Sequence, residues 1–500
     1  TTVSTPFVFH NDGWVYARAG GITETYDRDG RLQKIHFPSG NEQRIDVADN
    51  LLTVTDSFGR SLRLQMNHGQ WVSLTDAAGG QTLYQYNDDG ELISITHPDG
   101  TTRNYHYEDT THSALLTGIT DERGVRFATW QYDETGKANH SEHANGVDQA
   151  TIAYGVDGAL TVTNAVGHNQ FYQFSRHGSQ NKPDSIEGAP CTGLPSGKTS
   201  FTYDSNGNLT SKVTAEGQTF SYQYNSRGLE TSRTSEEGGQ ITTQWLPTTA
   251  LPVKVTEPTL TTDLTYDDHL RVTALKKTDR TTGAVRQWQF SYHADLNGVP
   301  GQLFAIDGPR TDVADVTHFD YDSQGNLVAV TDAAGNITQY QNYDANGRPQ
   351  QIVTPNGQIS TLRYDYAGRL LLLSRSAGDT VLTRDATGNI TSVTNPDGSV
   401  IQYQYDDAGR LITTTDSQGN RRVITYDNLN DVLAETLTDA GGHAHYQRNY
   451  LYNEIGYLTG QRDGLGNQSY YGWNRVQDLV GVTDPAGHSH SYLVDGFHHV

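Results

Sequence analysis

The residues of this 500-residue chain that could do chemistry are above all its 58 carboxylates and 19 histidines. Adjacent acids such as Asp406 and Asp407 are of the type that a glycosidase places about 5 to 10 Å apart across a sugar. Neighbouring residues on an extended chain point in opposite directions, however, and a turn role already accounts for Asp406. We therefore expect no glycosidase site at this pair.

Two histidine pairs could be metal ligands, because residues two positions apart face the same way on a strand. They are His443 with His445 and His488 with His490, and neither pair is accompanied by further ligands at a fixed spacing. The segment HSEH (140–143) lacks the HExxH spacing of a helical zinc site. We predict no metal site and no cofactor.

Cys191 is the only cysteine, so the chain can form neither an internal disulfide nor a cysteine zinc cage. As a nucleophile it would need an activating partner, but it lies in a stretch rich in Pro and Gly without a recognisable nucleophile motif. Neither GxSxG nor the phosphate-binding GxxxxGK[ST] occurs. We predict that this region is not an enzyme and has no catalytic residues.

Composition and charge limit the partners of the chain. The formal net charge of −23 would repel phosphate backbones, so nucleic acid is a poor partner. No apolar run approaches the roughly 20 residues of a membrane helix, so we expect no membrane span. Only 34% of residues are hydrophobic, yet 29 Tyr, 13 Phe and 6 Trp are too many for a disordered polymer. The chain should fold, but around a thin core.

A short repeated phrase organises the sequence, as in YDDAGRLITTTDSQGN (405–420). Copies of the YD phrase recur mostly every 21 or 22 residues, with degenerate copies before about residue 150. Between the phrases, stretches such as VIQYQYD (400–406) alternate apolar with polar residues, which is typical of strands with one buried face. Each unit therefore predicts strand, turn, strand, turn.

The repeated Asp and Gly are predicted to form the turns. Asp at the first turn position can accept hydrogen bonds from the backbone ahead, and Gly at the fourth adopts a left-handed conformation without steric cost. The residues that we assign to this structural motif are Tyr203, Asp204, Gly207, Tyr321, Asp322, Gly325, Tyr343, Asp344, Gly347, Tyr364, Asp365, Gly368, Tyr405, Asp406, Gly409, Tyr426 and Asp427.

The predicted fold is all-β. More than 20 hairpins imply on the order of 40 strands, whereas open twisted sheets rarely exceed about 10 without curling. We expect one long antiparallel ribbon of hairpins wound into a hollow shell. Residues 1–500 form a single region, with degenerate repeats in 1–181, a Pro/Gly-rich insert at 182–199, clearer repeats in 200–500, and further inserts near 245–258 and 296–315.

The YDxxGxL and TDxxGN phrases, as in 203–229, 321–336 and 405–420, resemble the YD repeat of bacterial Rhs proteins. That family is related to components of insecticidal toxin complexes and to teneurins. The resemblance implies a cocoon that encloses its own C-terminal toxin domain and is secreted or delivered to target cells, with type VI secretion and interbacterial competition as the setting. TDPAG (483–487) fits an ordinary repeat turn, not the family's self-cleaving Asp. We expect the sequence to be part of a longer protein.

The alternative is a carbohydrate-binding or adhesive module that contacts surface glycans through exposed aromatic side chains. The two hypotheses differ in the position of the aromatics. A shell wall predicts that the Tyr of the YD phrase is buried between neighbouring strands, whereas a lectin predicts an exposed aromatic row.

Overall fold

The computed structural model describes residues 7–10, 13–18, 21–38, 40–236, 238–294 and 301–494. The fold class predicted from the sequence is confirmed, because these residues form 45 β-strands in one sheet. The helical residues assigned an element are Ala144–Gly146, a single 3₁₀ turn named η2. No helix of the described residues is long and apolar enough to cross a membrane.

The strands of the first half of the ribbon are β1 (Phe7–His10), β2 (Gly13–Ala17), β3 (Thr23–Asp27), β4 (Leu32–His36), β5 (Glu42–Ala48), β6 (Leu51–Asp56), β7 (Ser61–Asn67), β8 (Gln70–Thr75), β9 (Gln81–Tyr86), β10 (Leu92–Thr96), β11 (Thr102–His106), β12 (Gly118–Thr120), β13 (Arg126–Tyr132), β14 (Ala138–His143), β15 (Val147–Tyr154), β16 (Ala159–Asn164), β17 (Asn169–His177), β18 (Gln180–Gly188), β19 (Gly197–Tyr203), β20 (Leu209–Val213), β21 (Thr219–Tyr224) and β22 (Glu230–Ser235).

The strands of the second half are β23 (Gln240–Trp245), β24 (Pro252–Thr256), β25 (Leu260–Tyr266), β26 (Val272–Asp279), β27 (Val285–Tyr292), β28 (Leu303–Asp307), β29 (Val316–Tyr321), β30 (Leu327–Thr331), β31 (Ile337–Tyr343), β32 (Pro349–Val353), β33 (Ile359–Tyr364), β34 (Leu370–Arg375), β35 (Gly378–Arg384), β36 (Ile390–Thr394), β37 (Val400–Tyr405), β38 (Leu411–Thr415), β39 (Arg421–Tyr426), β40 (Val432–Thr438), β41 (Ala444–Tyr452), β42 (Leu458–Asp463), β43 (Gln468–Trp473), β44 (Leu479–Thr483) and β45 (Ser489–Ser491).

Each strand pairs antiparallel with the next strand along the sequence, as β37 does with β38 and β38 with β39. Successive turns of such a ribbon must fall on opposite edges, since the chain reverses at every turn. A repeat unit holds two strands and two turns, so all YD turns lie on one edge and all TD turns on the other. We call these the YD edge and the TD edge.

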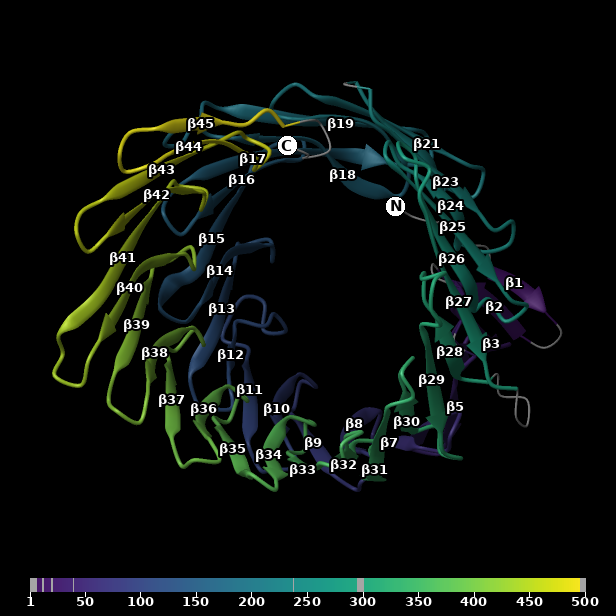
Figure 1. Ribbon diagram of the computed structural model, residues 1–500. Helices are drawn as coiled ribbons and strands as arrows, with labels where there is room; N and C mark the ends of the chain where they lie inside the picture. Colours follow the sequence, from purple (N-terminus) through teal and green to yellow (C-terminus); the bar gives the residue numbers. More distant parts are fainter. Residues whose placement is uncertain are drawn as a thin grey trace.

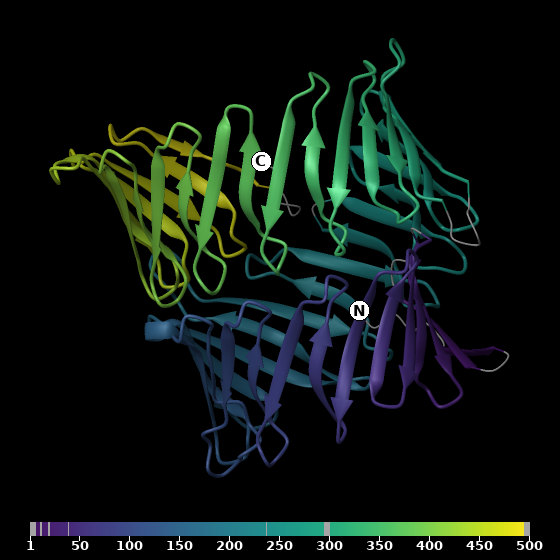
Figure 2. The ribbon, with the colours of Figure 1, turned by 90° about the horizontal axis from the view of Figure 1, so that it is seen from below.

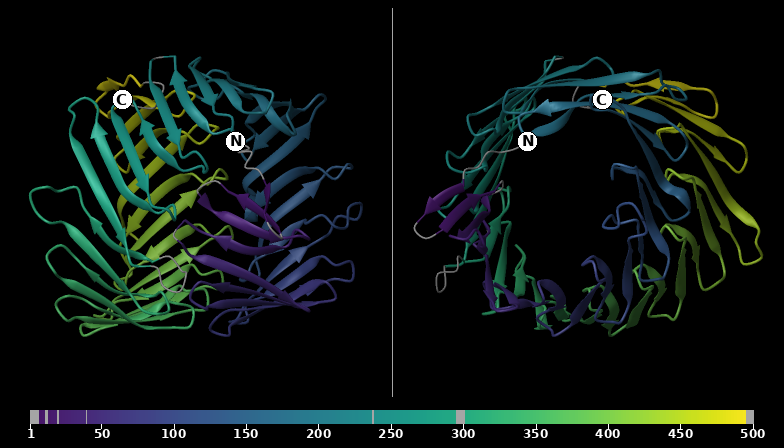
Figure 3. Two further views of the ribbon diagram at one scale, coloured as in Figure 1. Left: turned by 90° about the vertical axis from the view of Figure 1, so that its right-hand side faces the viewer. Right: turned by 180° about the vertical axis from the view of Figure 1, so that it is seen from behind.

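The ribbon winds around an open centre (Figure 1). Strands β1–β22 form a first winding, and β23–β45 form a second winding that lies on top of it (Figure 2). The same stacking of the green and yellow strands on the purple and blue ones is visible from the side, and the open centre is visible from behind (Figure 3). The windings thus stack edge to edge.

Regular bulges accompany the curvature. At the YD edge the pairing shifts register beside the Tyr, as between Gln404 and Tyr405 and between Thr425 and Tyr426. A bulge bends its strand and increases the local twist. Because these shifts recur on one edge, their bends add along the ribbon and favour a coil over a flat sheet.

The wall is one sheet thick. A compact protein of 55.0 kDa would expose about 18,000 Å² by the usual scaling of surface with mass, whereas this chain exposes 27870 Å². Among the described residues, the fully buried apolar side chains are few and scattered, such as Ala128, Val147 and Ile424. Stability must therefore come from the strand ladder and the half-buried aromatic face.

The segments predicted as inserts contain more strand than the sequence indicated. In 182–199, strand β18 extends to Gly188 and β19 begins at Gly197, so only the residues between them form a loop. Strand β24 occupies Pro252–Thr256 of the second insert. The third insert contains β28 (Leu303–Asp307), while 295–300 lie outside the described residues. Prolines are compatible with these strands because Pro183 and Pro252 lie next to register shifts.

Gly409 tests the turn geometry. It has φ 83°, and a Cβ at this position would meet nothing within 4 Å, so only the backbone conformation should resist substitution. We expect Gly409→Val to destabilise the hairpin by about 1–2 kcal/mol, measured as lost hydrogen-exchange protection in residues 400–415. Gln404→Val, on an exposed strand position, is the control and should leave protection unchanged. Equal protection in Gly409→Val and wild type would contradict the assigned turn.

Candidate functional site

The repeated Asp organises each YD turn through its carboxylate. In the turn after β37, one oxygen of Asp406 accepts the backbone N–H of Arg410 at 2.9 Å, and the other accepts its Nε–H at 2.8 Å. The backbone closes the same loop, since the N–H of Gly409 donates to the carbonyl of Asp406 at 3.0 Å. The carboxylate therefore holds both the turn and the residue that follows it.

Most of the other predicted motif turns have the same arrangement. Except after Asp427, the residue four positions after each motif Asp is a side-chain donor: Arg348 and Arg369 reach Asp344 and Asp365 at 2.6 Å. Asn208 and Asn326 reach Asp204 and Asp322 at 2.9 Å. The glycines all have positive φ, namely Gly207, Gly325, Gly347, Gly368 and Gly409. The role of the Arg or Asn was not predicted, although its recurrence four residues after Asp is visible in the sequence.

The arginines also connect successive turns along the YD edge. Arg410 donates from Nη1 to the carbonyl of Asp427 in the next YD turn at 2.7 Å, and its guanidinium lies 4.8 Å from the Tyr426 ring centroid. Arg348 makes the equivalent bond to the carbonyl of Asp365 at 2.9 Å. Each such arginine thus joins two successive YD turns, which the chain itself connects only by way of the TD edge.

The Tyr of the YD phrase bonds to the backbone of a neighbouring strand. The hydroxyl of Tyr426 donates to the carbonyl of Leu411 at 2.9 Å, and Tyr405 does the same to Ile390 at 3.0 Å. Leu411 lies beyond the last pair of the β38–β39 ladder, Thr413 with Val423, so the phenol extends the hydrogen bonding of that ladder. Burial raises the pKa of both tyrosines.

The same bond recurs with some substitutions. Tyr203, Tyr343 and Tyr364 donate to the carbonyls of Pro183, Leu327 and Pro349. Trp473 takes the place of Tyr and donates from Nε1 to Leu458 at 2.6 Å. Tyr321 is different, because its ring packs edge-on against His293 with centroids 5.9 Å apart. All five of the other predicted tyrosines therefore turn their hydroxyl toward backbone.

The carboxylate of Asp416 is held ionised by its own turn. In the TD turn after β38, the Nδ2–H of Asn420 and the backbone N–H groups hold the pKa of Asp416 below its usual range. A carboxylate engaged in this way is a poor general acid at neutral pH. The geometry fits a structural role.

The two windings meet along a line of turns that we call the seam. TD turns of the first winding contact YD turns of the second, and the bonds between them join residues far apart in the sequence. Arg123 donates to the carbonyls of Asp406 and Asp407 at 3.1 and 2.8 Å. Asn346 donates from Nδ2 to Asp76, 270 residues earlier, at 3.1 Å. At these contacts, polar side chains join the turns of the two windings.

The loop between β18 and β19 adds a further seam contact. Thr192 donates its backbone N–H and its hydroxyl to the two carboxylate oxygens of Glu454, at 2.7 and 2.8 Å. Arg475 lies against Gly188 and Gly197, where a Cβ would come within 3.0 and 2.2 Å of its side chain. The Pro/Gly-rich segment therefore fastens the second winding to the first.

The remaining candidates for chemistry lie apart from one another. His443 and His445 both contact the carboxylate of Asp439, at 3.3 and 3.1 Å, on an exposed turn. The described residues contain no group of three His, Cys, Asp or Glu arranged to hold a metal ion. Burial raises the pKa of the Cys191 thiol, which disfavours the nucleophilic thiolate.

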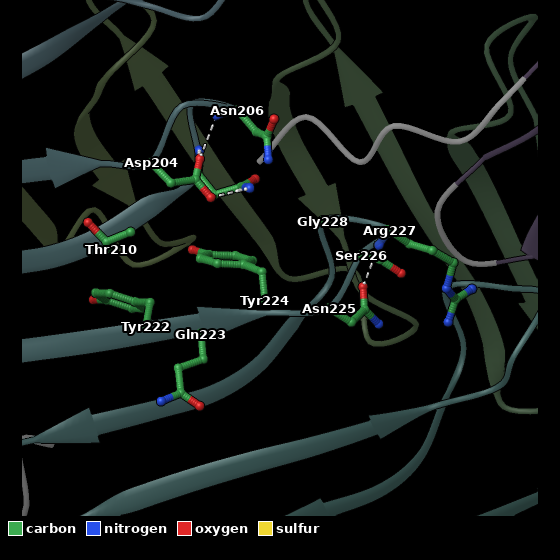
Figure 4. A pocket seen from close by; sticks show the side chains of 11 residues that line it. Asp204, Asn206, Thr210, Tyr222, Gln223, Tyr224, Asn225, Ser226, Arg227 and Gly228 are labelled. Atoms are coloured by element: carbon green, nitrogen blue, oxygen red, sulfur yellow. Dashed lines mark hydrogen bonds between the residues drawn. The ribbon is translucent and has the colours of Figure 1, made fainter.

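Figure 4 shows a polar hollow of about 810 Å³ between two successive YD turns. Tyr222, Tyr224 and Thr210 line it together with the turn residues around Asp204 and Asn225. The polar groups of the turns are already used: Asp204 accepts from Asn206 and Asn208, and Asn225 accepts the N–H of Arg227 at 2.9 Å. Few groups at these turns are left to orient a ligand.

An apolar pocket of about 610 Å³ lies where Pro38 of the first winding meets strands β25–β28. Leu270 lines this pocket and occupies the position that is Gly in most YD turns, with φ 64°. Such a conformation is unfavourable for a branched side chain. Leu251 extends the apolar surface toward Gly21 of the first winding, so the pocket belongs to the seam.

The wound antiparallel sheet, with its repeated Asp turns and Tyr–backbone hydrogen bonds, is of the YD-repeat type. The teneurin YD-shell family matches residues 247–471, and the RHS repeat family matches 67–111 and 195–240. Over these segments the chain therefore consists of RHS and teneurin-type YD repeats. The family recognised from the sequence is therefore confirmed. No curated protein matches the chain.

One solved structure shares the fold at low sequence identity. The crystal structure of TcdB2-TccC3 aligns with a TM-score of 0.59 and 15% identity, covering 92% of this chain and 29% of that chain. A structure of the Photorhabdus luminescens Tc holotoxin pore aligns with a TM-score of 0.42 and 16% identity, over 98% of this chain and 30% of that one. The chain thus spans less than a third of the TcdB2-TccC3 chain.

The hydrogen bond from the YD tyrosine to the backbone can be tested with Tyr426→Phe. Loss of the bond to the Leu411 carbonyl should cost about 1 kcal/mol and reduce hydrogen-exchange protection where β38 meets β39. Tyr403→Phe is the matched control, because no hydrogen bond is seen from that hydroxyl in the described part of the chain. Equal protection in the two variants would show that the ring of Tyr426, and not its hydroxyl, stabilises this part of the sheet.

The seam can be tested with a pair of glycines. A Cβ at Gly325 would lie 2.5 Å from the Phe58 ring of the first winding, whereas the site at Gly409 is open. Gly325→Ala and Gly409→Ala share the strain of a positive φ, so their difference reports the contact between windings. We expect Gly325→Ala to be the more destabilising and to lower hydrogen-exchange protection in residues 56–60. Equal effects of the two substitutions would contradict the stacking.

Proposed function

We propose that the chain forms part of the wall of a container that encloses a toxin domain for delivery to target cells. The observation that carries the proposal is a single-layer sheet of 45 strands that winds around an open centre. Such a wall exposes far more surface than a compact fold does and is stabilised by repeated turns. This form supports an enclosing role.

The proposal extends to cargo and delivery. The cargo is a toxin domain C-terminal to the wall in the same polypeptide, as the resemblance to Rhs proteins implies. The likeness to TcdB2-TccC3 supports the shell fold alone, because the identity is 15%. We propose that the full protein is secreted or delivered by a bacterial machine, with type VI secretion as one route. The wall itself is proposed to have no catalytic activity.

Glycan binding is the alternative function, and the hollow in Figure 4 is its best support because it combines two tyrosines with amide side chains. The position of the motif tyrosines argues against it. Their rings are half-buried and, Tyr321 apart, their hydroxyls bond to backbone, so they form no exposed aromatic row. A glycan array with the purified wall should therefore show no specific binding.

The container is tested with the full protein encoded by the complete reading frame. We expect a protease to leave its C-terminal cargo intact while the same cargo, produced alone, is degraded at least tenfold faster. Arg123→Ala, which removes seam bonds, should increase cleavage of the enclosed cargo. Arg310→Ala removes an exposed arginine whose carboxylate partner is the nearby Asp312, and is the control. Equal degradation of enclosed and free cargo would overturn the proposal.

A further inference from the structure

One YD turn places a second acid at the donor position of the motif. In most of the other turns that begin with Asp, the residue four positions later donates to the second carboxylate oxygen, as Arg410 does to Asp406 and Asn389 does to Asp385. In the turn after β39, the sequence is YDNLND, and Asp431 occupies the donor position opposite Asp427. Asp427 still accepts the backbone N–H groups of Leu429 and Asp431 at 2.8 and 2.9 Å. Its side-chain donor has been replaced by a second acid.

One oxygen of the Asp431 carboxylate is left without a partner. Its Oδ2 is buried and makes no hydrogen bond to any described residue. A Cβ at Gly456 would lie 3.0 Å from this oxygen, so the next YD turn packs closely on it. Asp478 has the same position in a later turn, but there Asn474 donates from Nδ2 at 2.8 Å. An unpartnered buried oxygen is destabilising, and more so when it is charged.

This turn lies at the seam. The N–H of Asp148, at the start of β15, donates to the carbonyl of Asn428 at 2.8 Å. Next to it, Asn145 donates from Nδ2 to Asp407 at 3.2 Å. Val147 is among the most buried apolar residues described, with 3% of its surface exposed. The η2 loop of the first winding is therefore fitted tightly against this turn.

The charges that face Asp431 are mostly acidic. Burial, together with the carboxylates of Asp427 in its own turn and Asp148 across the seam, raises the pKa of Asp431 to about 6. On the neighbouring strand β41, burial and then the charge of Asp431 raise the pKa of Tyr452 to about 12. His143 lies 3.6 Å from Asp148 and is the cation nearest to that carboxylate when protonated.

We propose that Asp431 is a proton-operated lock between the two windings. Protonated, it supplies the O–H donor that Asp427 lacks and removes the repulsion from Asp148, so the η2 loop is held on the turn at 427–431. Deprotonated, it places three carboxylates together at a tight contact and loosens this part of the seam. The lock does not depend on what the shell encloses.

The direction of the pH dependence follows from the raised pKa. A group that binds its proton more tightly in the closed seam stabilises it fully below the pKa of the free carboxyl, about 3.9. That stabilisation is lost as the pH rises through about 6. With these two values, the closed seam should be favoured about tenfold more at pH 5 than at pH 7.5.

The test is hydrogen exchange of the whole chain at pH 5 and pH 7.5, corrected for the intrinsic exchange rate, in residues 142–150 and 427–432. We expect about tenfold more protection at pH 5 in the wild type. Asp431→Asn should be protected equally at both pH values, because its Nδ2–H can donate to Asp427 as Asn389 does to Asp385. Asp478→Asn, at the same motif position, should keep the wild-type pH dependence.

Two results would overturn the lock. One is equal protection of the wild type at both pH values. The other is a pH dependence that survives in Asp431→Asn but disappears in His143→Gln, which would assign the effect to the pair of His143 with Asp148. Because the readout is local exchange at the seam, neither result bears on whether the shell encloses cargo.

Discussion

The bond on which this structure depends is the one between a turn carboxylate and the backbone N–H four residues ahead. It fixes the length of each hairpin loop, as Asp406 does with Arg410, and so sets the phase of the strands on either side. A ribbon of 45 strands tolerates few errors in phase, because a slip of one residue would move every side chain to the opposite face. The repeated Asp prevents such a slip at each turn.

The alternation of two turn phrases gives the ribbon two chemically different edges. The YD edge carries the Tyr ladder and the arginines that join successive turns, whereas the TD turn at Asp76 presents its carboxylate and the TD turn at Asp121 presents Arg123. The windings stack because these edges are complementary: Arg123 and Asn346 reach across from opposite sides. Because the repeat alternates two kinds of turn, the two edges of the wall differ and the windings stack in one direction.

Much of the fold was accessible from the sequence because its determinants are local. Spacing and turn residues predicted the antiparallel hairpins and the approximate number of strands, and the composition predicted a thin core. The seam was not accessible, since which turn meets which depends on bends and twists summed over about twenty strands. Nothing in the spacing of the repeats predicts that Thr192 contacts Glu454. The Pro/Gly-rich segment contains strands because their pairing with neighbours outweighs the local preference of Pro and Gly.

During synthesis, the hairpins can form before the contacts of the seam do. Each hairpin contacts only its neighbours, so the ladder has low contact order and can assemble as the chain leaves the ribosome. The contacts of Arg123 with Asp406 and Asp407 join residues 283 and 284 positions apart and must wait for the second winding. At roughly 5–20 residues per second, the first winding spends tens of seconds with its TD edge uncovered. During that interval a nascent shell is vulnerable to pairing with another chain, and a chaperone could act there.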